Sequence, residues 1–228
     1  MSELKEILYK TFIYDNRYLF FLEGLKFTLI IALFSVLLGL ILGVITSVIR
    51  DYYRETKKIK ILSKLCDIYV YVIRGTPTIL QLMILYYVVF KSATISPIIV
   101  GILAFGINSG AYVSEIFRAG FEGIDKGQRE ASKTLGLNYI KTMRHVIFPQ
   151  SLAKIFPALG NEVITLVKET SIAGYIGIVE LMKAADIIST RTYDYFFPLL
   201  VSTIIYLFLT FILSKVMKYG ERKLNHGI

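Results

Sequence analysis

The sequence is poor in the residues that build disulfides, metal centres and nucleotide-binding loops. Its 228 residues include one cysteine, Cys66, which excludes an internal disulfide. The two histidines, His145 and His226, do not give the spacing of a Cys/His metal site. No Gly-x-x-x-x-Gly-Lys-Ser/Thr loop occurs, and no Ser/His/Asp set or carboxylate pair suggests catalysis. We therefore expect no enzyme activity, no metal and no cofactor in this chain.

Apolar residues are abundant instead. The chain is 55% hydrophobic, with a mean hydropathy of +0.60, which points to several membrane helices rather than an ordinary soluble domain. Each span needs ~20 residues, so the length suits one domain of about five spans. The N-terminal residues carry charges of both signs and lack the pattern of a cleavable signal peptide. The expected fold is all-α: a polytopic membrane protein with a single transmembrane domain, residues 1–228.

Five apolar stretches locate the spans. Phe27 to Ile49 is an uncharged run of 23 residues, long enough to cross a bilayer. The second span is interrupted at Gly75 and Pro77, where the proline removes one backbone hydrogen bond. Pro157 and Gly160 predict that the fourth span is also broken. The expected spans lie approximately at residues 19–49, 65–90, 97–118, 151–177 and 196–217, with a loop at residues 121–150.

Basic residues indicate the orientation. The net charge of +9 is compatible with nucleic-acid binding, but the basic residues cluster beside apolar runs, and the positive-inside rule explains them better. Residues 50–64, 118–154 and 215–223 hold 17 Lys and Arg residues, whereas the alternate segments hold seven. This asymmetry predicts an outer N-terminus, a cytoplasmic C-terminus and a cytoplasmic 121–150 loop. Residues 178–195 are expected to form a surface helix on the outer side.

The polar stretch from Asp125 to Pro149 predicts a helix-turn-helix elbow. Asp125 suits the cap of a first helix, with Gln128 completing a capping box. Gly136 suits the left-handed position after that helix, Asn138 suits the cap of a second, and Pro149 limits its continuation. The plain interpretation is a solvated cytoplasmic loop. The elbow carries five basic residues: Lys126, Arg129, Lys133, Lys141 and Arg144.

The order of residues in this elbow resembles the loop signature of ABC-importer permeases. That family's pattern is Glu-Ala-Ala, three residues, Gly, nine residues, Ile, one residue, Leu-Pro. Here Ser132, Val146 and Phe148 replace the second Ala, the Ile and the Leu. In the family, this loop docks into a groove on the ATP-hydrolysing subunit. The resemblance therefore implies coupling roles for Arg129, Glu130, Ala131, Gly136 and Pro149.

Three further runs resemble the polar amino acid branch of the same family: residues 74–82, 109–118 and 159–171. The resemblance implies the permease subunit of a polar amino acid ABC importer in the bacterial cytoplasmic membrane. Its implied partners are ATP-binding ATPase subunits, an extracytoplasmic amino-acid-binding protein, a second permease subunit and membrane lipid, without nucleic acid. The sequence leaves open which amino acid is carried and whether the permease pair is a homodimer. An ion-gradient-driven carrier or channel subunit is the alternative, although such a protein has no need of the elbow.

Polar residues at membrane depth are the candidate substrate site, because buried charges in a bilayer face a cavity or a partner. Glu162 suits an ammonium group and inclines the prediction towards a basic or amide amino acid. Arg74 or Lys168 suits the substrate carboxylate. Glu162 and Lys168 are six positions apart and do not stack on one helical face, so they are expected to have different neighbours. An interfacial ion pair without a ligand role is the alternative for these charges. The remaining candidates are Thr76, Gln81, Asn108, Tyr112, Glu115 and Asn161.

Overall fold

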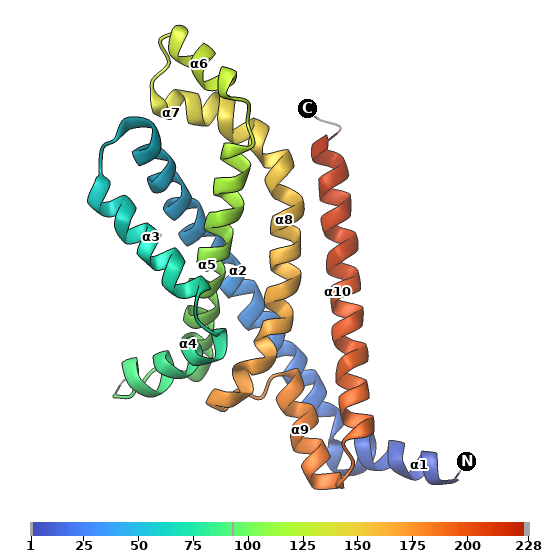
Figure 1. Cartoon of the computed structure of the whole chain (residues 1–228). Coiled ribbons are helices and arrows are strands. Elements are labelled where there is room, and N and C mark those ends of the chain that lie inside the picture. The colour runs from blue at the N-terminus through green and yellow to red at the C-terminus, as the bar shows by residue number, and fades with distance from the viewer. Residues whose placement is uncertain (1, 93, 226–228) are drawn as a thin grey trace. The chain divides into compact units, whose positions relative to one another are not determined.

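The structure is a computed structural model that describes residues 2–92 and 94–225, so that His226 lies outside the described residues. The described residues form helices and no strand, which confirms the all-α prediction (Figure 1). Four helices are long: α2 (Tyr18–Thr56), α5 (Pro97–Glu122), α8 (Phe148–Glu169) and α10 (Phe196–Asn225). The shorter elements are α1 (Ser2–Leu8), η1 (Tyr9–Ile13), η2 (Tyr14–Asn16), α3 (Lys60–Arg74), α4 (Thr78–Ile84), η3 (Leu85–Val89), α6 (Lys126–Thr134), α7 (Tyr139–Thr142), η4 (Met143–Ile147), η5 (Thr170–Ile176) and α9 (Leu181–Thr192).

Three of the described helices, α2, α5 and α10, are long and apolar enough to cross a membrane. The pair α3 and α4–η3 passes the same criterion as one broken span. Its break at residues 75–77 confirms the interruption expected from Gly75 and Pro77. The charged helix α8 is not among the candidate spans, so the fourth predicted span, at residues 151–177, stays a prediction.

The chain divides into two compact units whose boundaries fall within the long helices. The first unit comprises residues 1–35, 78–105 and 164–212; the second comprises residues 36–77, 106–163 and 213–228. Helices α2, α5, α8 and α10 each supply residues to both units.

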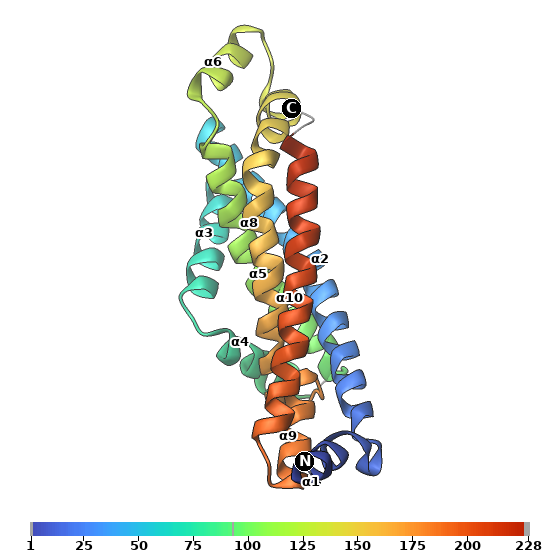
Figure 2. The same cartoon turned by 90° about the vertical axis from the view of Figure 1, so that its right-hand side faces the viewer.

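Helix α9 belongs to the core of the first unit. Leu181, Ala185 and Ile188 are fully buried and cluster with Phe21 of α2. The Ser202 hydroxyl of α10 donates to the Leu181 carbonyl oxygen at 3.0 Å, and the helices lie side by side in both views (Figure 2). Met182, Thr190 and Arg191 are exposed, so α9 is amphipathic, as the spacing at residues 178–195 predicts, and its place on the outer side stays a prediction. Its spaced apolar residues face the protein and not only a membrane surface.

The second unit is packed around Val113, Phe117, Phe121 and Ile155. Helix α2 approaches α5 closely because Gly39 and Gly43 carry no side chain. A Cβ at Gly39 would lie 2.9 Å from the Ser109 Cβ, and one at Gly43 would lie 2.9 Å from the Ser114 backbone nitrogen. The two glycines are thus at a helix–helix contact, as small residues commonly are in membrane proteins.

Two helices are longer than the sequence suggested. Helix α2 continues to Thr56, so the basic stretch after Ile49 begins as helix and the turn is confined to residues 57–59. Polar side chains in this extension have ion-pair partners, and no residue there breaks a helix. Lys57 and Ile59, both with positive φ, make the turn.

Helix α8 is continuous through Pro157 and Gly160, so the predicted break at these residues was wrong. A helix tolerates an internal proline where its neighbours cover the freed backbone. A Cβ at Gly160 would lie 3.1 Å from Met217 of α10, so this glycine serves close packing. The α-helix ends after Glu169, where the 3-10 turn η5 leads to Gly177 with a φ of +82°.

Candidate functional site

A cavity of about 470 Å³ lies in the second unit. Arg74, the last residue of α3, forms one part of its wall. One face of α5 and one face of α8 form the rest, with the α8 residues spaced four apart along the helix. The lining residues are Arg74, Tyr112, Glu115, Ile116, Arg118, Ala119, Gly120, Lys154, Ala158 and Glu162.

Glu115 is the centre of an ion cluster at this cavity. Its carboxylate lies 2.6 Å from Arg50 Nη1, 2.8 Å from Arg118 Nη2 and 3.4 Å from Arg74 Nη1. Arg50 also donates to Asp67 at 2.7 Å, which ties α2 to α3. Charge-assisted hydrogen bonds of this kind fix arginine side chains in defined positions. The carboxylate of Glu115 is therefore already occupied by cations.

Arg74 keeps a large part of its surface open. Its side chain is 42% exposed, although it contacts Glu115. The guanidinium carbon lies 5.3 Å from the centre of the Tyr112 ring, within the range of a cation–π contact. Arg74 is thus oriented by two neighbours and still lines the cavity.

Glu162 has a different environment from Glu115. In the described part of the chain its carboxylate accepts a hydrogen bond from the Ser109 hydroxyl at 2.7 Å and has no basic side chain within ion-pair distance. A half-buried carboxylate without a cation is costly in protein unless a ligand or water offsets its charge. The cavity thus contains an uncompensated acid and an oriented arginine.

The structure brings together four of the nine predicted substrate residues: Arg74, Tyr112, Glu115 and Glu162. The others do not line this cavity. Thr76 donates its hydroxyl to the Val72 carbonyl oxygen, Asn108 is buried, and Asn161 is exposed on α8. Gln81 and Lys168 belong to the first unit.

The elbow has the geometry that its sequence predicts. The Asp125 side chain accepts from the Gly127 amide at 2.8 Å and caps α6. Gly136 has a φ of +71°, and the Leu137 amide donates to the Ser132 carbonyl oxygen, which closes the helix end. Asn138 caps α7 by accepting from the Lys141 amide at 3.0 Å. Figure 1 shows α6 and α7 as a bent pair beyond the ends of α5 and α8 in this unit.

Two details of the elbow differ from the expectation. The Gln128 side chain accepts from Gln150 rather than completing a capping box with Asp125. Pro149 does not end the second helix, because the backbone passes through the π-turn η4 into α8. The Phe148 amide donates to the Met143 carbonyl oxygen in this turn. Proline has no backbone amide hydrogen and cannot donate the hydrogen bond of a regular helix. The wider hydrogen-bond spacing of the π-turn accommodates this missing donor.

The elbow residues fall on two faces. Glu130, Ala131, Gly136 and Pro149 are exposed. Arg129 is directed inward, with 11% of its side chain exposed, and pairs with Asp51 and Glu55 of α2. The exposed face is therefore free to meet another protein, whereas Arg129 holds the elbow to its own chain.

Residues 35–226 match the family model described as "Binding-protein-dependent transport system inner membrane component". The chain belongs to this family. This permease is 41% identical over 208 residues to the arginine transport system permease protein ArtQ of Bacillus subtilis, with 90% of this chain and 93% of the relative covered. It is 38% identical to the putative glutamine transport system permease protein GlnP of Rickettsia typhi, with the same shares covered.

Solved structures agree with the family match. A crystal structure of an amino acid ABC transporter with histidines has a chain that is 38% identical and superposes with a TM-score of 0.81, covering 90% of this permease and 94% of that chain. The MetNI methionine ABC transporter in an inward-facing conformation gives 0.77 at 20% identity, covering 91% and 97%, which supports the fold alone. The ABC-permease resemblance is therefore confirmed, and the comparisons give no support to a gradient-driven carrier.

The sequence analysis missed four polar residues of the site: Arg50, Ser109, Arg118 and Lys154. Arg50 was assigned to a loop, and Arg118 only marked the end of a span. Only Ser109 held a usable signal, since it shares helical spacing on α5 with Tyr112, Ile116 and Ala119. The Lys154 ammonium donates to the Gly123 carbonyl oxygen at 2.6 Å, a contact that no local pattern reveals.

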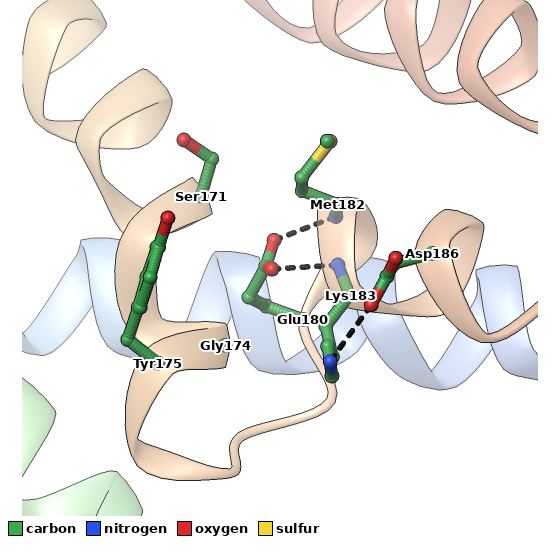
Figure 3. A pocket seen from close by; sticks show the side chains of 7 residues that line it. All are labelled: Ser171, Gly174, Tyr175, Glu180, Met182, Lys183 and Asp186. Atoms are coloured by element: carbon green, nitrogen blue, oxygen red, sulfur yellow. Dashed lines mark hydrogen bonds and ion pairs between the residues drawn. The ribbon is translucent and has the colours of Figure 1, made fainter. Parts of the chain in front are cut away.

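A second cavity, of about 330 Å³, lies in the first unit of the permease (Figure 3). Glu180 is fully buried beside it, and its carboxylate accepts from the amides of Met182 and Lys183, both at 2.7 Å. Burial raises the pKa of Glu180 to about 7, although these hydrogen bonds oppose the shift. Lys183 pairs with Asp186 at 2.8 Å. Glu180 is thus committed to capping α9.

Proposed function

We propose that this permease binds a polar amino acid in the second-unit cavity during ATP-driven import. The observation that carries the proposal is that one cavity is lined by two side chains of opposite charge. Glu162 has no cationic partner in the described part of the chain, and Arg74 is held in place by Glu115 and Tyr112. A zwitterionic amino acid needs both a carboxylate and a cation as partners. Arg74 and Tyr112 also lie within candidate membrane-spanning helices, where charge is retained chiefly for function.

In this proposal, Glu162 binds the substrate ammonium group and Arg74 binds its carboxylate. Glu115 has a different role from the one expected. Its oxygens are occupied by arginines, so it orients Arg74 instead of contacting the substrate. Ser109 orients the Glu162 carboxylate through its hydroxyl.

The substrate class follows from the charge of Glu162. Its carboxylate can bind either the α-ammonium group or a cationic side chain, and a carboxylate also accepts hydrogen bonds from an amide. The names of similar permeases include arginine and glutamine transport. We infer a basic or amide amino acid.

The coupling partners are inferred from the elbow. An ATPase subunit docks on the exposed face of α6 and α7, which carries Glu130 and Ala131, and binds the ATP. The membrane unit is completed by a second permease subunit, and an extracytoplasmic binding protein delivers the amino acid. We place the N-terminus outside and the C-terminus in the cytoplasm of a bacterial cell, with five spans, from the distribution of basic residues.

The test is amino acid uptake by the permease–ATPase complex in liposomes. We expect Glu162→Gln to raise the KM for the transported amino acid at least tenfold, a loss of about 1.4 kcal/mol, while the complex still assembles. Glu23→Gln is the matched control, because Glu23 is exposed on α2. Unchanged uptake of every amino acid by Glu162→Gln would refute the assignment of the site.

A further inference from the structure

Asp51 of α2 holds both helices of the elbow at once. Its side chain is only 4% exposed. Arg129 of α6 donates to both carboxylate oxygens, at 3.1 and 3.3 Å, and the Tyr139 hydroxyl of α7 donates at 3.0 Å. Arg54, one turn along α2, donates to the same carboxylate. A single buried carboxylate thus ties α6 and α7 to the end of a long helix.

Neighbouring contacts reinforce this link. Glu55, one turn after Asp51, pairs with Arg129 at 3.3 Å and with Lys133 at 3.2 Å. Two acids spaced four apart on α2 therefore face two bases spaced four apart on α6, so that one helix cannot slide past the other without breaking several contacts. The Tyr139 ring packs edge-on against Tyr52, with centroids 4.9 Å apart. These contacts fix both the orientation of the elbow relative to α2 and its distance from that helix.

The preceding residue of α2, Arg50, contacts the cavity cluster instead of the elbow. It donates to Glu115 at 2.6 Å, and Glu115 in turn contacts Arg74 of the substrate cavity. Consecutive residues on one rigid helix therefore contact the elbow and the cavity cluster. Such contiguous contacts can carry energetic coupling between two sites. Coupling is demonstrated when a change at one site is measured at the other.

We propose that Arg50 and Asp51 are positioning residues that transmit movement of the elbow to the substrate cavity. ATP-driven displacement of the elbow pulls on Asp51 through Arg129 and Tyr139. Helix α2 carries the displacement to Arg50, which shifts Glu115 and the arginines around it. This inference rests on the proposed function, because it takes the elbow as the ATPase contact and the cavity as the substrate site.

The test measures amino acid uptake and ATP hydrolysis together, in liposomes that contain the permease–ATPase complex and its binding protein. We expect Asp51→Asn to lower the uptake per ATP hydrolysed roughly tenfold with the substrate KM unchanged. Arg50→Gln is expected to change both the KM and this ratio, because it contacts the cavity cluster. Asp186→Asn is the matched control, since it removes an ion-pair carboxylate from α9.

A double-mutant cycle separates transmission from a general loss of stability. Arg129→Gln should lower the uptake per ATP hydrolysed by the same factor as Asp51→Asn. The double variant, which carries both substitutions, should lower it no further. If Asp51→Asn fails to assemble, Tyr139→Phe and Arg129→Lys replace it, because each leaves the carboxylate other donors. A wild-type ratio of uptake to hydrolysis in these variants, or fully additive losses, would overturn the inference. Failure of the wild-type complex to transport at all would instead refute the proposed function.

Discussion

Individual acidic residues of this permease differ chiefly in what surrounds their carboxylates. Glu115 is occupied by arginines, Asp51 by Arg129 and Tyr139, and Glu180 by backbone amides. Glu162 has only a hydroxyl donor in the described structure. Burial combined with an incomplete set of partners marks a residue that is available to a ligand.

The sequence identified Glu162 and Arg74 as site candidates because charged residues are rare at membrane depth. It did not distinguish them from Glu115, since the occupancy of a carboxylate depends on residues far along the chain. Arg50 lies 65 positions from Glu115, and no local pattern relates the two. Gln81 and Lys168 were included on the same polarity argument, and their role stays a prediction.

Glu180 gives a pH-dependent prediction. Its pKa is raised from an ordinary 4.5 to about 7, mainly by burial, and it lies between η5 and α9, outside the candidate spans. The folded permease therefore binds this proton more tightly than the unfolded chain, so stability is greatest below about pH 4.5 and falls as pH rises to about 7. From this residue alone, we expect the Tm to fall by roughly 5–10 °C between pH 5 and pH 8.

Glu180→Gln provides the control, because the amide has similar shape and does not titrate. Thermal unfolding of both proteins in detergent at a series of pH values should show the smaller pH dependence in Glu180→Gln. Parallel curves for the two proteins would show that Glu180 is not the titrating group.

At the scale of elements, the helix–helix contact between α2 and α5 is set by missing side chains. Gly43→Ala should destabilise the permease by about 1–3 kcal/mol, because the new Cβ would meet the Ser114 backbone nitrogen at 2.9 Å and the helices would have to separate. Gly101→Ala is the control, since its Cβ would lie 3.3 Å from the Ile178 terminal methyl group and 4.0 Å from that of Ile31, both at the ends of side chains. Equal Tm values for the two variants would argue against a tight contact.

The elbow gives a second prediction at this scale. Gly136 has a φ of +71° and no atom within 4 Å of an added Cβ, so a substitution there strains the backbone without a steric clash. We expect Gly136→Asp to insert normally but to reduce substrate-stimulated ATP hydrolysis, because its charge lies on the proposed docking face. Gly136→Asn tests backbone strain alone, since asparagine tolerates this conformation and is uncharged. Undiminished stimulated turnover in Gly136→Asp would count against the docking face.

Local physics accounted for the elbow and less well for the long helices. Asp125, Gly136 and Asn138 act within a few residues of themselves, so their positions could be predicted from the sequence. The continuity of α8 through Pro157 depends on neighbours that cover its backbone, and the burial of α9 depends on Phe21, some 160 positions earlier. Such effects arise only when the chain has folded.

For the whole molecule, the prediction concerns orientation in the membrane. With Cys66→Ser as background, Lys10→Cys should react with a membrane-impermeant thiol reagent added to intact cells. Lys141→Cys should react only after the cells are permeabilised, because the basic elbow is expected in the cytoplasm. Both lysines are exposed in the structure, so burial does not limit their labelling. The reverse pattern would invert the topology.

The central claim is that this permease transports an amino acid only when a partner ATPase hydrolyses ATP. The most direct measurement combines the purified permease with its candidate ATPase subunits in liposomes and records ATP hydrolysis with and without amino acid and binding protein. The account predicts hydrolysis that is stimulated by the amino acid and requires the permease, with uptake that stops when ATP is withheld. Uptake driven by an ion gradient alone, with no associated ATPase, would contradict it.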